Sequence, residues 1–175
     1  MKLSISSFSI LAALPLLLAG PGYAAPPPGV APPAITVLQS SPNVADGLIF
    51  VAPKGAGLGS GSSPLPIGPE IIDDQGRPIW FNPITNGQTA TYFRVQQYKG
   101  KPVITYSEAG GVGGLAVGQT VDYILDREYR VIKTVIAGNG YDADSHEFRI
   151  SPQNTALITI YNAIPYDLSS GWRSN

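Results

Sequence analysis

Short apolar stretches recur along this chain at a nearly constant interval. Residues 48–51 (LIFV), 103–106 (VITY) and 157–160 (LITI) are rich in β-branched and aromatic side chains, and each begins 54 or 55 residues after the one before it. Stretches of this length and composition predict β-strands. Self-similarity with such a period predicts an array of repeated structural units. The pattern therefore predicts an all-β protein built from a unit of about 54 residues.

Two further pairs of segments support the repeat. Residues 71–80 (IIDDQGRPIW) correspond to residues 124–132 (ILDREYRVI) at an interval of 53 residues, and residues 92–95 (YFRV) correspond to residues 147–150 (EFRI) at an interval of 55. The first pair has the form of two strands joined by a tight turn. Because several different segments repeat at nearly the same interval, whole hairpins and not only single strands are expected to repeat.

The middle copy contains the full unit. Alternation and turn residues predict four strands and two tight turns, the strands at residues 91–96, 102–108, 121–126 and 130–136 and the turns at residues 98–101 and 126–129. Four consecutive antiparallel strands form one blade of a β-propeller. This copy therefore defines a blade at residues 91–136.

The other two copies follow the same plan. The first, at residues 35–82, has strands expected at residues 35–38, 48–52, 70–73 and 79–81. The third begins at His146, turns at residues 151–154 and returns through residue 161, which leaves an incomplete blade at residues 146–175.

Together these copies amount to a partial β-propeller of about two and a half four-stranded blades, whereas closed propellers have roughly four to eight blades. We therefore interpret the chain as the N-terminal part of a longer protein. The alternative is self-assembly, in which several copies join through their open blade edges.

The beginning of the chain has the features of a secretory signal peptide. Lys2 precedes an apolar run at residues 10–18, and small residues follow up to a cleavage site near Ala24. A membrane anchor is the weaker reading, because this run is short and contains Pro15. We expect a signal peptide at residues 1–24, a proline-rich linker at residues 25–34 and a secreted, extracellular protein.

Composition narrows the possible partners. The chain has no Cys, so disulfides cannot stabilise it, and its 20 Gly and 17 Pro suit short strands and turns. The net charge is −1, with 11 basic and 12 acidic residues and no basic cluster. We therefore expect neither a nucleic-acid nor a membrane partner.

Candidate chemistry concentrates around the single histidine. His146 follows an acidic, glycine-containing segment that connects the second blade to the third. The first strand of a propeller blade is normally the innermost, so this connection should open at the mouth of the central channel. We select His146, Asp144 and Glu147 as candidate catalytic residues, in which Asp144 or Glu147 could orient the imidazole ring.

Other readings of the same residues stay open. His146 could share a face with Phe148 and Ile150 and pack between blades, and residues 141–144 could form an ordinary turn. Asp142, Asp144 and His146 could bind a metal, although the segment lacks the Gly and distal Glu of a calcium loop. A Ser-His-Asp catalytic triad that uses Ser145 is implausible, because adjacent residues of an extended strand point to opposite faces. We expect no metal and no cofactor.

Residues 123–161, with residues 69–81 and 100–108, resemble the secreted arylsulfotransferase-like proteins, which are related to bacterial arylsulfate sulfotransferases. The most specific part of the resemblance is Asp144-Ser145-His146-Glu147-Phe148. It implies a six-bladed propeller that binds small phenolic and aryl sulfate substrates.

The resemblance also implies a reaction. A channel histidine would carry a sulfuryl group from an aryl sulfate to a phenolic acceptor without a nucleotide cofactor, and further His and Arg residues would bind the sulfate. His146 matches a family histidine, either the nucleophile or a sulfate-binding residue. Because the chain has one His, we expect it to be inactive by itself. The alternative function is a non-catalytic secreted β-propeller that serves as a binding module.

Overall fold

The computed structural model describes residues 30–41, 45, 47–54, 66–110, 120–162, 164–165 and 167. The predicted signal peptide and the first half of the proline-rich linker lie outside these residues. The described part of the chain contains β-strands and no helix, so the all-β prediction is confirmed. Consequently, it offers no apolar helix of membrane-spanning length.

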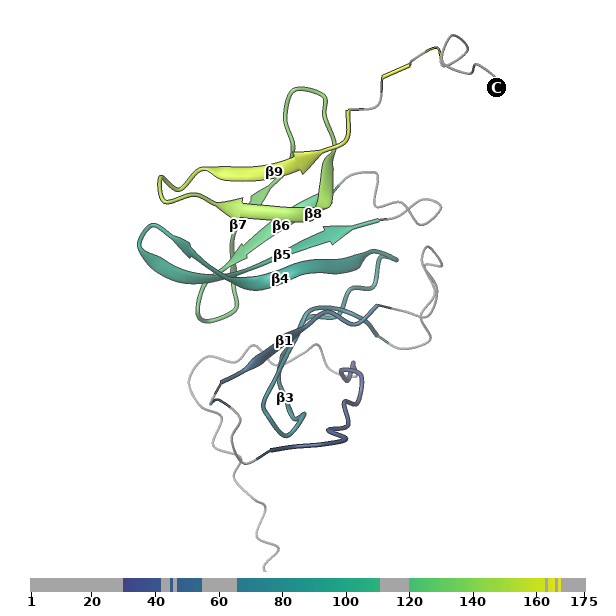
Figure 1. Cartoon of the computed structure of the whole chain (residues 1–175), viewed down its shortest axis with the longest axis vertical. Coiled ribbons are helices and arrows are strands. Elements are labelled where there is room, and N and C mark those ends of the chain that lie inside the picture. Colours follow the sequence, from purple (N-terminus) through teal and green to yellow (C-terminus); the bar gives the residue numbers. More distant parts are fainter. Residues whose placement is uncertain are drawn as a thin grey trace, which may run out of the picture.

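The strands form three separate antiparallel sheets, which follow one another along the chain (Figure 1). The first sheet has the order β1 (Ile49–Val51), β2 (Glu70–Ile72), β3 (Pro78–Phe81). The middle sheet has the order β4 (Thr89–Tyr98), β5 (Lys101–Ala109), β6 (Thr120–Leu125), β7 (Val131–Val135). The third is the hairpin of β8 (Ala143–Ile150) and β9 (Ala156–Ile160).

The middle sheet contains the four strands that the sequence predicts, each within two residues of the expected ends. The β4–β5 turn is tight because Lys99 and Gly100 both adopt positive φ, at 52° and 73°. Two consecutive residues of positive φ give the turn type whose twist matches that of the flanking strands.

The first sheet differs from the prediction, because residues 35–38 do not form a strand. The main-chain oxygen of Ile35 instead lies beside the β2–β3 turn, 3.0 Å from where a Cβ on Gly76 would stand. Val37 is 42% exposed and Leu38 is 94% exposed. The segment therefore lacks the buried face that holds apolar residues in a sheet.

The third sheet also begins earlier than predicted. A turn at residues 138–141, closed by a hydrogen bond from the Tyr141 nitrogen to the Gly138 oxygen, precedes β8. Asn139 and Gly140 adopt positive φ there, as both residue types do readily. The turn considered as an alternative at residues 141–144 thus lies at residues 138–141, and β8 starts at Ala143 instead of His146.

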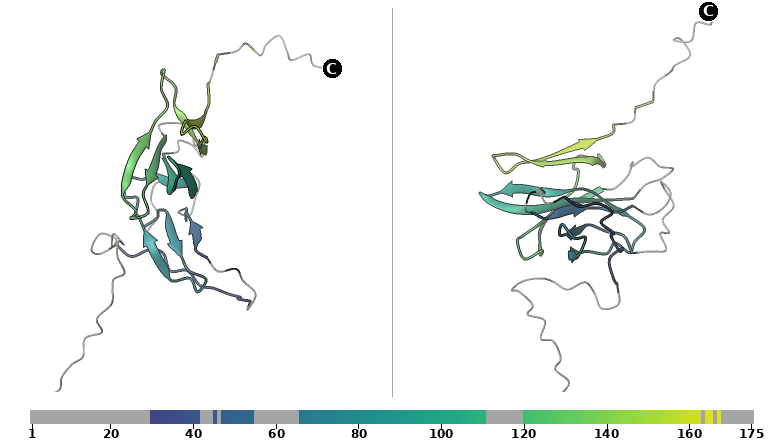
Figure 2. Two further views of the ribbon diagram at one scale, coloured as in Figure 1. Left: turned by 90° about the vertical axis from the view of Figure 1, so that its left-hand side faces the viewer. Right: turned by 60° about the horizontal axis from the view of Figure 1, so that its bottom comes forward.

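The three sheets pack face to face, and the middle sheet is covered on both sides (Figures 1 and 2). Toward the first sheet it presents Phe93, Tyr106, Tyr123 and Leu125, which contact Phe50, Ile71 and Trp80. Toward the third sheet it presents Tyr92, Val103 and Ile124, which contact Phe148, Ile150 and Ile158. Because side chains alternate between the two faces of a strand, the middle sheet contributes apolar residues to the cores on both of its sides.

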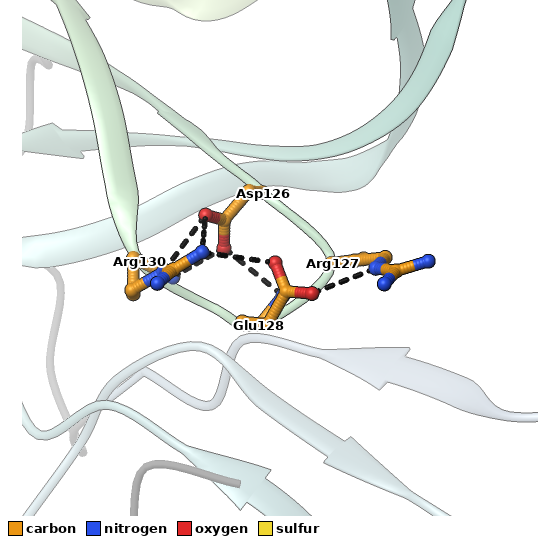
Figure 3. A network of polar contacts seen from close by, with 4 residues as sticks. All are labelled: Asp126, Arg127, Glu128 and Arg130. Carbon is orange, nitrogen blue, oxygen red and sulfur yellow. Dashed lines mark hydrogen bonds and ion pairs between the residues drawn. The ribbon is translucent and has the colours of Figure 1, made fainter. Parts of the chain in front are cut away.

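An aspartate organises the turn between β6 and β7 (Figure 3). The Asp126 Oδ1 atom accepts hydrogen bonds from the main-chain nitrogens of Glu128 and Arg130, each at 2.9 Å, and Oδ2 accepts one from Arg130 Nε at 2.9 Å. Burial raises the pKa of Asp126, but hydrogen bonds and the charge of Arg130 outweigh it and hold the pKa below its usual value.

The β2–β3 turn has the same construction. Asp73 Oδ1 accepts hydrogen bonds from the Gln75 and Arg77 nitrogens at 2.9 and 2.8 Å, and Oδ2 accepts one from Arg77 Nε at 2.6 Å. The β8–β9 turn is a simpler version, in which Ser151 Oγ accepts a hydrogen bond from the Thr155 nitrogen at 3.1 Å. The sequence repeat between residues 71–80 and 124–132 therefore extends to the side-chain contacts of the β2–β3 and β6–β7 turns.

Candidate functional site

The strand that carries the candidate residues is irregular. The pairing of β8 with β9 shifts between Ala143 and Phe148, so strict alternation is lost over these residues. Ser145 is buried, His146 is 68% exposed at its side chain, and Phe148 is completely buried. His146 and Phe148 therefore do not share a buried face, and His146 does not pack between the sheets that the structure describes.

His146 lies against a buried carboxylate. Its Nδ1 atom is 2.7 Å from Asp144 Oδ1 and 2.9 Å from Asp144 Oδ2. The Asp144 side chain is 4% exposed and also accepts hydrogen bonds from Thr159 Oγ1, at 3.1 Å, and from the His146 main-chain nitrogen, at 3.3 Å. These donors hold the carboxylate in one orientation, and the carboxylate in turn fixes the ring.

This geometry determines the chemistry available to the imidazole. An ionised carboxylate only accepts hydrogen bonds, so the neutral ring carries its proton on Nδ1 and keeps a lone pair on Nε2. A neutral imidazole oriented in this way can act as a nucleophile or as a general base. The buried carboxylate also stabilises the positive charge that develops on the ring when Nε2 reacts.

Glu147, the third candidate, belongs to a separate group of side chains. Its Oε1 atom accepts a hydrogen bond from Arg149 Nε at 2.7 Å and lies 3.4 Å from the Tyr92 hydroxyl. Arg94 Nη1 donates to the same hydroxyl at 2.6 Å. Hydrogen bonds to Glu147 and Tyr92 raise the pKa of Arg149. The structure thus brings Asp144 to His146 but places Glu147 with Tyr92 and the two arginines.

The three residues considered as metal ligands do not form a metal site. In the described part of the chain, no group of three or more His, Cys, Asp or Glu side chains is placed to hold a metal ion. Asp142 is exposed, ahead of the strand that carries Asp144 and His146. Asp144 instead uses its oxygens to bind His146 and Thr159.

A second buried carboxyl group lies close to the site and was not selected from the sequence. Thr91, Ser107 and Asp122 are directly paired across β4, β5 and β6. Ser107 Oγ donates to Asp122 Oδ1, while Thr91 Oγ1 donates to the Ser145 main-chain oxygen at 2.8 Å. This row of polar side chains therefore lies under the beginning of β8.

Asp122 is almost completely buried, and burial raises its pKa to about 6, although the hydrogen bond from Ser107 partly offsets this. Among the described residues, neither Asp122 Oδ2 nor the nearby Thr120 Oγ1 has a hydrogen-bond partner. The alternation of β6 could have revealed the group, because Asp122 falls on the same face as Ile124.

A groove of about 330 Å³ lies elsewhere, between β7 and the β8–β9 hairpin. Its lining includes Lys133, Val135, Ile136, Ile150 and Ala156, but not His146. The Asp144–His146 pair is therefore a surface site, separate from this groove.

The chain was compared with protein-family models, curated proteins and solved structures, and none of them matches it.

Proposed function

We propose that this chain forms part of an arylsulfotransferase-like β-propeller, in which His146 accepts a sulfuryl group from an aryl sulfate and passes it to a phenolic acceptor. The observation that carries the proposal is the contact between His146 Nδ1 and the buried carboxylate of Asp144, at 2.7 and 2.9 Å. Together with the high exposure of the ring, it leaves Nε2 available to a substrate.

The arrangement of the sheets supports the propeller part of the proposal. Phe93 and its repeat counterpart Phe148 both point toward the preceding sheet, on strands that open their respective sheets. Blades of a propeller repeat in this way, each using the same face toward its neighbour. We propose that the sheets are blades of a six-bladed propeller, of which this chain supplies about two and a half.

The reaction would proceed in two displacements. The Nε2 lone pair attacks sulfur, the N–S bond forms, and the bond between sulfur and the aryl oxygen breaks. The phenolate that leaves takes a proton from water. The oxygen of the acceptor phenol then attacks sulfur, the N–S bond breaks, and the phenol proton passes to solvent. Covalent relay of this kind divides one difficult transfer into two easier steps.

Asp144 would act on the ring and not on the substrate. Sulfuryl transfer to Nε2 makes the imidazole cationic, because Nδ1 keeps its proton. The Asp144 carboxylate lies against that proton and stabilises the cation. Asp144 is therefore a positioning and charge-stabilising residue in this proposal.

Cationic groups that bind the sulfate are a further requirement of this chemistry. Arg94 and Arg149 are bound to Tyr92 and Glu147. The resemblance implies additional His and Arg residues for this task, and we propose that these come from other blades.

The experiment that tests the proposal is a stoichiometric labelling, with 4-nitrophenyl sulfate, of the complete propeller protein that contains this chain. We expect release of nitrophenol together with the addition of one SO₃ group, which peptide mass spectrometry should locate on His146. His146→Ala should abolish the label, and Asp144→Asn should slow its formation. Asp74→Asn, in the exposed β2–β3 turn, is the matched acidic control and should label like the unmodified protein.

A label on another residue, or none at saturating aryl sulfate, would exclude the nucleophilic role of His146. The tautomer can be tested independently, because the chain contains a single histidine. Nitrogen NMR shifts should show the proton on Nδ1, and Asp144→Asn should change this preference.

The second candidate function is a non-catalytic binding module. It is favoured by the separation between His146 and the groove beside β7, since enzyme sites usually occupy a concave pocket. In this case His146→Ala should leave ligand binding and thermal stability unchanged, and no sulfuryl adduct should form.

A further inference from the structure

The described part of the chain contains two Asn-Gly pairs, at residues 86–87 and 139–140. In this sequence the asparagine side chain is open to attack by the main-chain nitrogen of the next residue, because glycine has no Cβ to shield that nitrogen. Asn86 and Asn139 are both exposed. Their contacts differ, however, and this difference decides which of the two carboxamides is able to react.

The Asn86 side chain is held by three hydrogen bonds. Its Oδ1 atom accepts one from the Gln88 main-chain nitrogen at 3.0 Å, and its Nδ2 atom donates to Gln88 Oε1 at 2.8 Å and to Glu108 Oε1 at 2.7 Å. Glu108 is 9% exposed, so the side chain is anchored to the packed part of the middle sheet. Turning the carboxamide toward the Gly87 nitrogen would break these hydrogen bonds, and each of them opposes the motion.

The Asn139 side chain has no such anchor. Among the described residues, its carboxamide has no hydrogen-bond partner. The residue lies in the turn at residues 138–141, which is closed by the hydrogen bond from the Tyr141 nitrogen to the Gly138 oxygen at 3.1 Å. Apart from chain neighbours, a Cβ atom at Gly138 or Gly140 would meet nothing within 4 Å. The turn therefore stands in open space and can change shape without displacing packed side chains.

We propose that Asn139 is a deamidation site, which the folded protein converts to aspartate and isoaspartate, and that Asn86 is protected from this reaction. The Gly140 main-chain nitrogen attacks the Asn139 Cγ atom, a new N–C bond forms, and the proton of that nitrogen passes to solvent. The C–N bond of the carboxamide breaks and ammonia leaves, which gives a cyclic succinimide. Water then adds to either ring carbonyl and opens the ring. Water is the only co-reactant.

The reaction changes the connection that leads to the strand of His146. Both products add a negative charge to a segment that already contains Asp142 and Asp144, and isoaspartate also lengthens the main chain of the turn by one atom. β8 begins at Ala143, shortly after the turn. The modification therefore acts on the segment that joins the middle sheet to the third sheet.

The test follows both asparagines in one sample of the complete protein that contains this chain. During incubation at mildly alkaline pH, peptide mass spectrometry measures the fraction of each residue that is converted, and an isoaspartyl methyltransferase detects the isoaspartate. We expect Asn139 to convert at least about tenfold faster than Asn86, because it breaks fewer hydrogen bonds to react. Asn139→Gln should abolish the methylation that arises from this turn.

Two controls show whether the fold causes the difference. Short peptides with the sequences of residues 83–90 and 136–143 lack the folded contacts, and their asparagines should convert at similar rates. Gln88→Ala removes one of the acceptors of the Asn86 carboxamide and should speed the conversion of Asn86 in the folded protein. It should leave the conversion of Asn139 unchanged.

Three results would overturn the proposal. The first is conversion of Asn86 in the folded protein as fast as, or faster than, that of Asn139. The second is a difference of the same size in the two short peptides, which would assign it to neighbouring residues in the sequence and not to the fold. The third is an unchanged rate for Asn86 in Gln88→Ala, which would mean that its hydrogen bonds do not protect it.

Discussion

The side-chain amide of Gln96 donates a hydrogen bond to the main-chain oxygen of Phe148, at 3.0 Å, across the interface between the middle and third sheets. The other amide atom, Oε1, accepts a hydrogen bond from the Ile150 nitrogen at 2.9 Å. One side chain of β4 thus takes the place of a neighbouring strand along the edge of β8. This contact fixes the position of the hairpin that carries His146 relative to the middle sheet.

Gln96→Leu should destabilise the protein by about 1–3 kcal/mol, because it leaves the Phe148 oxygen and the Ile150 nitrogen without their partner. Urea unfolding followed by circular dichroism measures this change. Gln97→Leu is the matched control on the same strand, where the side chain is exposed, and it should change the free energy of unfolding by less than about 0.5 kcal/mol. Equal effects of the two substitutions would contradict the role of Gln96.

Phe148→Ala should be more damaging, at about 3–5 kcal/mol, because Phe148 is completely buried between the middle and third sheets. Hydrogen exchange should show that the amides of β8 and β9 lose protection, while those of β5 and β6 keep it. Uniform loss of protection in all three sheets would mean that they unfold as one unit.

The Asp122 carboxyl should make stability depend on pH. Burial raises its pKa from 3.8 to about 6, so the folded state holds this proton more tightly than the unfolded state. Its contribution to stability is therefore present at low pH and is lost as the pH rises through 6.

Asp122→Asn should remove this dependence. Between about pH 4 and pH 7, the variant should gain about 2 kcal/mol in free energy of unfolding relative to the unmodified protein. Urea unfolding at several pH values measures the difference in free energy of unfolding between the two proteins. A difference that stays constant with pH would show that Asp122 does not cause the pH dependence. Ser107→Ala should enlarge the pH dependence, because the Ser107 hydroxyl stabilises the charged carboxylate.

The Asp126 turn offers a test of how a single side-chain acceptor stabilises a hairpin turn. Asp126→Ala removes the acceptor for the Glu128 and Arg130 nitrogens and should cost about 1 kcal/mol. Asp126→Ser should cost less, because Ser151 accepts the corresponding hydrogen bond in the β8–β9 turn. Thermal unfolding measures both changes, and an equal loss in the two variants would show that Ser cannot replace Asp here.

Much of the fold follows from local patterns in the sequence. The four strands of the middle sheet and their turns were predictable, because alternation, β-branched residues and turn residues act over a few neighbouring positions. The prediction of a strand at residues 35–38 was wrong, because local composition does not show whether a sheet will cover the segment. Its apolar residues suit a strand, but Val37 and Leu38 remain exposed because no sheet face covers them.

The sequence by itself determined that this is an all-β chain with a repeated hairpin, and it identified His146 as the single imidazole. Only the tertiary structure decided that Asp144, and not Glu147, contacts that ring. The irregular pairing of β8 shifts which side chains are buried, and Asp144, Ser145 and His146 no longer alternate regularly. Where such a shift occurs depends on pairing between strands, through contacts such as those of Gln96, which no local pattern of residues encodes.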